Sequence, residues 1–266
     1  MNISFIGGGN MARAIIGGLK NNSFDMKAIT VIEPDAEKRT QLATEFNVQV
    51  SADYADDADI IVLAVKPQQL QEVCRQLSPL LHSQLIISIA AGIRSADISR
   101  WLNAYQAIVR VMPNTPAQIQ AGVSALYAMT NVSQMQRDQA TTILAAVGQT
   151  LWLDDEAKMD AVTAISGSGP AYVFYMIEAL QEAAIGLGLK AEEARMLALQ
   201  TFAGASLLAA QSVDDVKTLR AQVTSKGGTT EQGILALEAA NIKNTFMIAA
   251  KAAADKSVLL GNQLGK

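Results

Sequence analysis

The stretch that decides the fold reads Asn2-Ile3-Ser4-Phe5-Ile6-Gly7-Gly8-Gly9-Asn10-Met11-Ala12. A short apolar run, long enough for a strand, leads into three glycines and then into a helical pattern. Gly7, Gly9 and Ala12 fit G-x-G-x-x-A, in which the first glycine makes a tight turn, the second lets a pyrophosphate approach the backbone, and the small third residue lets helix and strand pack. Free N–H groups at the helix start favour a negative charge. The stretch therefore predicts a dinucleotide-binding turn, although the pattern alone also fits a turn that serves packing only.

Apolar runs alternate with helical patterns through the first half of the chain. After the first strand, further strands are expected at residues 29–32, 60–65, 85–89 and 107–112. Strands separated by helices indicate βαβ units, and the unbroken apolar run at 60–65 is typical of a strand buried on both faces. Edge strands at 122–129 and 150–153 are expected around a helix at 133–147. We therefore predict an α/β Rossmann domain with a doubly wound, mainly parallel sheet over residues 1–154.

The hydrophobic pattern of the sequence changes from residue 155 onward, where strand-like runs stop and alanine-rich helical patterns begin. Several of these patterns carry apolar residues on more than one face, which is typical of helices that associate with another subunit. Residues 155–266 are therefore predicted to form an all-α dimerisation domain. Its helices are expected at 170–187, 191–211, 214–222, 230–240 and 243–260.

Composition excludes several classes of function. The formal net charge of −4 and a pI of about 5.1 argue against a nucleic-acid partner, which calls for a clustered basic face. No segment offers the roughly 18 apolar residues of a membrane span, and the glycine turn begins where a secretory leader would lie. We expect a cytoplasmic protein.

Scarce residue types narrow the chemistry further. The single cysteine, Cys74, excludes an intramolecular disulfide and a multi-cysteine zinc site. The single histidine, His82, precedes the strand at 85–89 and so belongs at the edge of the sheet away from ligands. No metal site is expected.

Two positions leave alternatives open at the ligand edge of the sheet. Glu33 ends the second expected strand, close to the spacing of about 20 residues at which an acid binds the ribose hydroxyls of NAD. It equally fits an acid that merely precedes Pro34. Lys66 follows the strand at 60–65 and either approaches the cofactor or is a solvated loop lysine. Pro67 suits the first position of a helix without any ligand.

Other loops carry small or stiff residues. Residues 88–92 have side chains small enough for a ligand to approach the backbone, and residues 110–116, with Asn114 and two prolines, form a rigid loop where substrate is expected. Residues 166–170 read as a helix start, with Ser168 or Gly169 as the cap, and serve either close packing or ligand contact. Residues 224–232 pair two glycines with two threonines. They form either an anion nest for a carboxylate or a capped helix in which Thr229 and Gln232 make a capping box.

These motifs together resemble pyrroline-5-carboxylate reductases, and the likeness runs through both expected domains. It rests on Phe5-Ile6-Gly7-Gly8-Gly9-Asn10-Met11, Ala64-Val65-Lys66-Pro67, Ser88-Ile89-Ala90-Ala91-Gly92, Met112-Pro113-Asn114-Thr115-Pro116, Ser166-Gly167-Ser168-Gly169-Pro170-Ala171-Tyr172 and residues 224–238. The resemblance implies an NAD(P)H-binding domain followed by a helical domain that interlocks with a second subunit. The dimers can assemble further, for example into a ring. The implied reaction is reduction of the cyclic imine 1-pyrroline-5-carboxylate to L-proline, the last step of proline biosynthesis.

The resemblance also implies roles for individual residues. It assigns the cofactor to Gly7, Gly8, Gly9, Asn10, Met11, Ala12, Ala64, Val65, Lys66, Pro67, Ala90 and Ala91. We expect Ile6, Glu33 and Asn114 to contact the cofactor as well. It assigns the substrate to Glu156, Ser225, Gly227, Gly228, Thr229 and Thr230, with Thr230 as the expected catalytic residue. Glu33 stands where many members carry a small polar residue suited to NADPH, so both NADP and NAD are expected as cofactors. Lys226 replaces a common proline.

The scarcity of histidine agrees with this chemistry. Reduction of a ketone needs an acid to protonate the developing alkoxide, whereas a ring imine protonated on nitrogen is already electrophilic and mainly needs alignment with the nicotinamide. Two rival hypotheses stand beside it. A β-hydroxyacid dehydrogenase would use a lysine of the helical domain as general acid, and a non-catalytic NAD(P) sensor would bind cofactor without turnover.

Overall fold

The structure is a computed structural model of the 266-residue chain and describes residues 1–54 and 58–266. The chain divides into two compact units. Unit 1 comprises Met1–Ser168 together with Ala252–Lys266, and unit 2 comprises Gly169–Lys251. The division predicted after residue 154 differs from this one, because compactness within one chain assigns the segment after β8 and the C-terminal segment to unit 1. The domain boundary at residue 154 stays a prediction.

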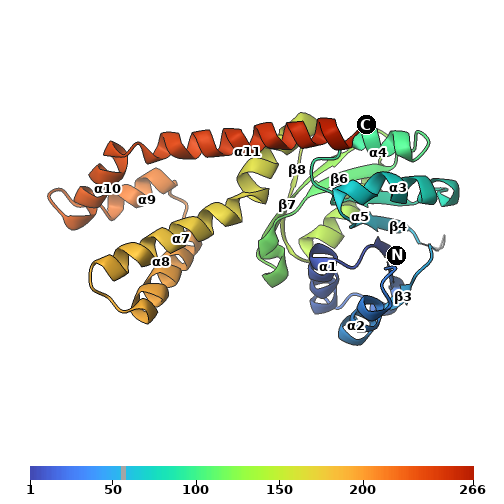
Figure 1. Ribbon diagram of the computed structural model, residues 1–266, viewed down its shortest axis with the longest axis horizontal. Coiled ribbons are helices and arrows are strands. Elements are labelled where there is room, and N and C mark those ends of the chain that lie inside the picture. Colours follow the sequence, from blue (N-terminus) through green and yellow to red (C-terminus); the bar gives the residue numbers. More distant parts are fainter. Residues whose placement is uncertain (55–57) are drawn as a thin grey trace. The chain divides into compact units, whose positions relative to one another are not determined.

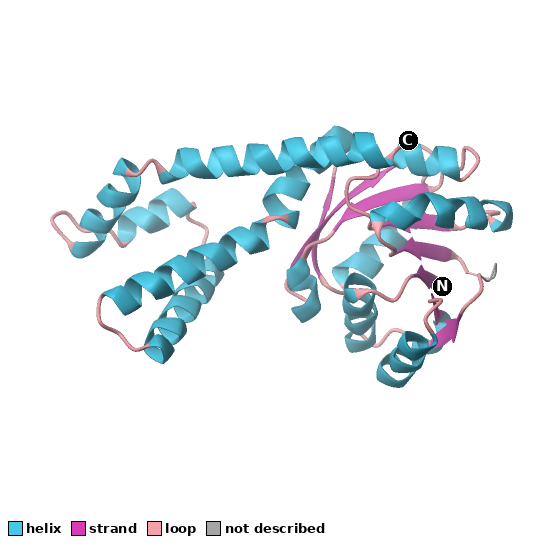
Figure 2. Cartoon of the chain, in the orientation of Figure 1, coloured by secondary structure: helices cyan, strands magenta, loops and turns pink. Residues whose placement is uncertain are grey.

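Unit 1 is built on a single eight-stranded sheet among the described residues, with the order β3-β2-β1-β4-β5-β6-β7-β8 (Figures 1 and 2). All neighbouring strands are parallel except β6 and β7. The sheet is therefore mainly parallel, as predicted. The strands are β1 Ile3–Ile6, β2 Ile29–Ile32, β3 Gln49–Ser51, β4 Ile60–Leu63, β5 Leu85–Ser88, β6 Ile108–Met112, β7 Gly122–Ala128 and β8 Gly148–Trp152.

Two strand predictions need correction. The segment expected as an edge strand at 122–129 is β7, which lies inside the sheet between β6 and β8. The true edge beside β2 is β3, Gln49–Ser51, which the sequence analysis missed. β3 has three residues and is only half-buried, so it lacks the apolar run by which the other strands were found.

Helices cover both faces of the sheet, and the strand side chains alternate between two apolar clusters. Phe5 and Val62 pack with α1, α2 and α5 on one face, whereas Ile6 and Ile61 pack with α3 and α4 on the other. The helices of unit 1 are α1 Asn10–Asn21, α2 Ala36–Phe46, α3 Pro67–Leu77, α4 Ser95–Trp101, α5 Gln134–Ala145 and α6 Met159–Val162, with short 3-10 turns at Met26–Ala28, Ser78–Leu80, Thr115–Ile119 and Glu156–Lys158.

The local signals read from the sequence hold in several places. Asp35 accepts hydrogen bonds from the backbone N–H groups of Glu37 and Lys38 and so caps α2, and Pro67 is the first residue of α3. Cys74 is buried on α3, and burial raises the pKa of its thiol to about 12. The packed-thiol interpretation of Cys74 is confirmed.

A helix, α7 Gly169–Gly186, begins where it was expected, but the cap expected at Ser168 or Gly169 is wrong. The chain is already helical through α6 and a π-helical turn at Thr163–Gly167, and Ser168 itself has helical dihedrals. The backbone N–H of Ser168 donates to the carbonyl of Thr163, so no free helix end needs a cap there. Gly167 is tightly packed, since a Cβ atom on it would lie 2.3 Å from Cε of Met112. Close packing, one of the two readings of this segment, therefore holds for Gly167.

Among its described residues, unit 2 has helices as its regular secondary structure and no strands. Its helices are α7 Gly169–Gly186, α8 Ala191–Gln211, α9 Val216–Gln222, α10 Thr229–Ala239 and the part of α11, Ile242–Leu264, that ends at Lys251. Many large apolar side chains remain exposed in the single chain, among them Phe174, Tyr175, Leu207, Leu208, Met247 and Ile248. An apolar surface of this extent is typical of an interface with another subunit. None of the described helices is long and apolar enough to span a bilayer.

Candidate active site

The glycine turn has the geometry that its pattern predicts. Gly7 adopts φ +99°, and a Cβ atom on it would lie 3.0 Å from the carbonyl oxygen of Ala64, so both its backbone and its space call for glycine. Gly9 is the N-cap of α1, makes no side-chain cap, and has nothing within 4 Å of its missing Cβ position. Ala12 is buried against the sheet. The turn thus presents an uncapped helix start beside open space, which fits a pyrophosphate.

The Glu33 carboxylate forms a hydrogen bond with the backbone of the glycine turn. Its Oε2 accepts a hydrogen bond from the backbone N–H of Gly8 at 3.1 Å, and its Oε1 accepts one from that of Asp35 at 3.2 Å. The residue is 8% exposed, so its carboxylate is largely shielded from solvent. Arg39 donates to the carbonyl oxygens of Glu33 and Pro34. A carboxylate has about four acceptor sites, so about two remain for a ribose.

The predicted cofactor residues gather at one edge of the sheet. β1, β2, β4 and β5 run parallel, so their carboxyl ends lie together. This edge carries the glycine turn, Glu33, residues 64–67 and residues 90–91. Lys66 precedes α3 and is exposed, which leaves both of its readings open. His82 precedes β5 at the opposite edge, as expected.

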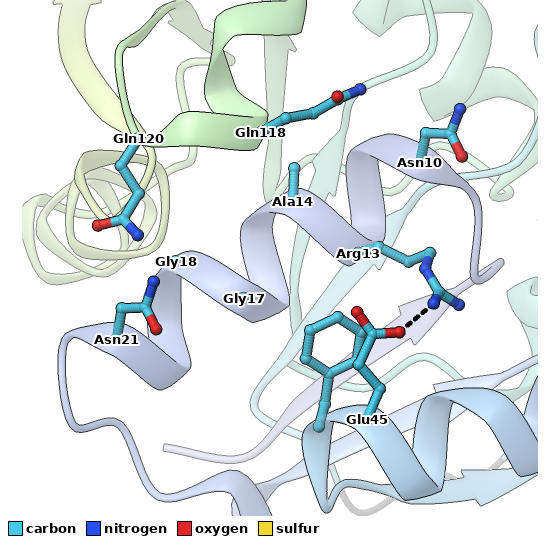
Figure 3. A pocket seen from close by; sticks show the side chains of 10 residues that line it. Asn10, Arg13, Ala14, Gly17, Gly18, Asn21, Glu45, Gln118 and Gln120 are labelled. Carbon is cyan, nitrogen blue, oxygen red and sulfur yellow. Dashed lines mark hydrogen bonds and ion pairs between the residues drawn. The ribbon is translucent and has the colours of Figure 1, made fainter.

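Two hollows lie near these residues in unit 1. One, of about 320 Å³, is bounded by Pro67, Ala91 and Gly92 and by the C-terminal part of α11, including Lys256, Ser257 and Leu260. The other, of about 410 Å³, runs along α1 and is shown in Figure 3. There Arg13 forms an ion pair with Glu45 of α2 and stacks over Phe46, so its guanidinium already has a carboxylate partner. Four residues with carboxamide side chains, Asn10, Asn21, Gln118 and Gln120, also line this second hollow.

Asn114 and Glu156 are both bound by neighbouring residues of unit 1. Asn114 accepts a hydrogen bond from the backbone N–H of Val123 at 3.0 Å and donates to Oγ of Ser166 at 3.4 Å. The Glu156 carboxylate accepts hydrogen bonds from the N–H and the hydroxyl of Ser95 and forms an ion pair with buried Arg110. Roles for Asn114 and Glu156 in ligand contact stay predictions.

The predicted substrate loop lies in unit 2, between α9 and α10. Gly227 adopts φ +76°, and its N–H donates to Oε2 of Glu231 at 2.7 Å. The N-cap of α10 is Gly228, with no side-chain cap, so the capping box expected between Thr229 and Gln232 is wrong. The first backbone N–H groups of α10, those of Thr229, Thr230 and Glu231, have no partner within the helix. Ser225, Thr229 and Thr230 are exposed.

Sequence reasoning missed several residues around these sites. They are Ser95 and Arg110 beside Glu156, Glu231 beside Gly227, and the α11 residues that bound the first hollow. For Arg110 a signal exists, because an arginine inside an otherwise apolar strand must find a partner when it is buried. Glu231 stands at N3 of α10, where acidic residues often bond a backbone N–H near the helix start. No motif marks the α11 residues.

Comparison with known proteins connects both halves of the chain to one family. Residues 156–260 match the family model described as "Pyrroline-5-carboxylate reductase dimerisation", and residues 2–92 match "NADP oxidoreductase coenzyme F420-dependent". The pyrroline-5-carboxylate reductase of Pseudomonas aeruginosa is 46% identical over 99% of this chain and 98% of its own, and that of Haemophilus influenzae is 42% identical over 96% of each.

Solved structures agree with the sequence relatives. A pyrroline-5-carboxylate reductase from Coxiella burnetii superposes with a TM-score of 0.93 at 43% identity, over 97% of this chain and 98% of that one. A Plasmodium falciparum pyrroline carboxylate reductase with NADP bound superposes with a TM-score of 0.86 at 31% identity, over 98% of each chain.

Proposed function

Because the chain belongs to the pyrroline-5-carboxylate reductase family, we propose how its residues carry out the reaction of that family. The protein is an NAD(P)H-dependent oxidoreductase of proline biosynthesis that reduces 1-pyrroline-5-carboxylate to L-proline. It carries a dimerisation region and self-associates. The observation that carries the mechanism is a pair of uncapped helix starts, one in each unit: that of α1 at Gly9 and that of α10 at Gly228.

The residues of the first helix start fit a dinucleotide. Gly9 has open space around its missing Cβ position, and Gly7 makes the tight turn with φ +99°. No acidic residue stands in the first turn of α1 to repel a pyrophosphate. Ile6, Asn10, Met11, residues 64–67 and residues 90–91 complete the cofactor edge in this proposal, with Asn114 on the loop after β6. Glu33 serves the cofactor by holding Gly8 in place. When bound, NAD(P)H supplies the hydride.

The second helix start is our proposed site for the substrate carboxylate. Backbone N–H groups of Thr229 and Thr230 point from the start of α10, where the helix dipole favours an anion. Ser225, Gly227 and Gly228 shape the loop around them. The hydroxyl of Thr230 hydrogen-bonds the ring nitrogen, whose charge is lost as the iminium is reduced. Ser95 and Arg110 leave about one acceptor site of the Glu156 carboxylate free, and any contact of Glu156 with the substrate would have to use that site.

The proposal also covers the oligomeric state of the protein and its location in the cell. We propose an interlocked homodimer in which one subunit's cofactor edge faces helices of its partner, with a ring of dimers as a higher assembly. The exposed apolar side chains of α7, α8 and α11 support such an interface. We also propose a cytoplasmic location.

Steady-state kinetics of Thr230→Ala test the proposed site. A contact that changes as the ring nitrogen loses its charge should lower kcat roughly ten- to a hundredfold, about 1.4–2.7 kcal/mol of barrier. A contact with the carboxylate alone would raise KM and leave kcat nearly unchanged. Thr142→Ala, on an exposed position of α5, is the matched control. Wild-type kcat and KM in folded Thr230→Ala would refute the assignment, and turnover of NADP with hydroxy acids instead of the imine would refute the reaction.

A further inference from the structure

Glu156 lies at the centre of a polar cluster inside unit 1. Its Oε1 accepts hydrogen bonds from the backbone N–H of Ser95 at 2.7 Å and from Nη1 of Arg110 at 2.9 Å, and its Oε2 accepts one from Oγ of Ser95 at 2.6 Å. The Arg110 side chain is 4% exposed and that of Glu156 is 20% exposed. Three of about four acceptor sites on the carboxylate are therefore in use.

The partners of Glu156 come from elements that are distant in sequence. Arg110 lies in β6, between Ser88 of β5 and Tyr127 of β7 in the sheet register. A guanidinium buried there needs an anionic partner, since an unpaired buried charge is strongly destabilising. Glu156, on the 3-10 turn Glu156–Lys158 that follows β8, is that partner.

Ser95 links the same carboxylate to the loop after β5. Ser95 is the first residue of α4, and the N-cap residue Arg94 makes no side-chain cap. Glu156 thus satisfies an N–H that the helix leaves unpaired. Residues 90–91, proposed to hold the cofactor, stand just before this helix start. Arg110 stands just before the loop that carries Asn114. One carboxylate therefore ties together two loops of the cofactor edge.

We propose that Glu156 is a positioning residue, which holds the loop after β5 and the end of β6 in the geometry that binds the cofactor. It acts through Ser95 and Arg110 and does not depend on contact with the substrate. This inference rests on the proposed function, because it concerns the same site. It differs from the family-based expectation, in which Glu156 belongs with the substrate.

Titration of the protein with NADPH in the absence of substrate tests the proposal. Glu156→Gln should raise the Kd of NADPH roughly ten- to a hundredfold, the scale of a lost charge-assisted hydrogen bond. Arg110→Met should act in the same direction. The double variant Glu156→Gln with Arg110→Met should bind NADPH no more weakly than Glu156→Gln alone, because no unpaired cation is left. Asp154→Asn, on the same segment and paired with exposed Lys158, is the matched control and should leave Kd unchanged.

A substrate contact would give the opposite pattern. The Kd of NADPH would stay at the wild-type value in Glu156→Gln, while KM for the imine would rise by the same factor whether residue 110 is arginine or methionine, and this result would overturn the proposal. If Glu156→Gln does not fold, Ser95→Ala removes only the hydroxyl bond. It should still raise the Kd of NADPH several-fold, and an unchanged Kd would overturn the proposal. Failure of the wild-type protein to reduce 1-pyrroline-5-carboxylate would instead refute the proposed function.

Discussion

At the scale of single residues, two glycines of the nucleotide turn are needed for different reasons. Gly7 combines φ +99° with a close approach to the carbonyl of Ala64, whereas Gly9 has ordinary dihedrals and open space. We expect Gly7→Ala to lower the free energy of unfolding by about 1–3 kcal/mol. Gly9→Ala should change it by less than about 0.5 kcal/mol and yet weaken NADPH binding. Thermal unfolding and NADPH titration of both variants check this, and equal destabilisation would contradict it.

The role of Glu33 can be tested by its effect on the use of NADH and NADPH. Glu33→Ser removes the acceptors of the N–H groups of Gly8 and Asp35, so the turn loosens for either cofactor. We expect KM for NADH and for NADPH to rise together, with the ratio of their kcat/KM values moving by less than about 0.5 kcal/mol. A ribose contact would instead shift that ratio toward NADPH by roughly 1–2 kcal/mol. Glu37→Ser, on the exposed first turn of α2, is the control. Loss of NADH activity alone would contradict the expectation.

At the scale of elements, the C-terminal part of α11 braces the loop after β5. A Cβ atom on Gly261 would lie 2.7 Å from the carbonyl oxygen of Gly92, and Arg94 donates to Oδ1 of Asn262 at 2.8 Å. On the same helix, Ser257 donates to Asp160 at 2.6 Å. The helix therefore holds in place a loop that lies far earlier in the chain, since Arg94 and Asn262 are 168 positions apart.

Two substitutions near the end of α11 test whether this helix positions the Gly92 loop. Gly261→Val should push the Gly92 loop away, cost about 1–3 kcal/mol of stability through overpacking, and raise the Kd of NADPH. Gln263→Ala, on the exposed side of the same helix, should leave both quantities unchanged. Calorimetry and NADPH titration separate the two. Wild-type values for Gly261→Val would show that the loop tolerates movement of α11.

At the scale of the whole molecule, the proposed active site draws on two subunits, and complementation tests this. One variant, Gly9→Asp, blocks the cofactor turn, where a side chain has room but a negative charge repels the pyrophosphate. The other, Thr230→Ala, damages the substrate loop. In randomly mixed dimers with shared sites, one site of each hybrid has both parts intact, so activity should recover to about a quarter of wild type. Sites made within one chain would show no recovery on mixing.

The sequence by itself determined the parts of this protein that depend on neighbouring residues. The strand, glycine turn and helix at residues 2–12, the mainly parallel sheet, the cap at Asp35 and the helix Ala191–Gln211 all follow from short patterns. These patterns act through local dihedral preference, capping and periodic burial, each of which is written within a few residues. The family motifs likewise predicted the reaction from the sequence, because each motif is a contiguous stretch of residues.

Only the tertiary structure decided what the acidic side chains do. Glu33 bonds Gly8, 25 positions earlier, and Glu156 bonds Ser95 and Arg110, 61 and 46 positions earlier. Such partners are chosen by which donors the folded sheet leaves unpaired, and no spacing in the sequence records that choice. The same reason explains why β7 lies inside the sheet and why the end of α11 packs with unit 1. Burial and pairing are properties of the assembled chain, because an unpaired buried group is costly wherever its partner lies in the sequence.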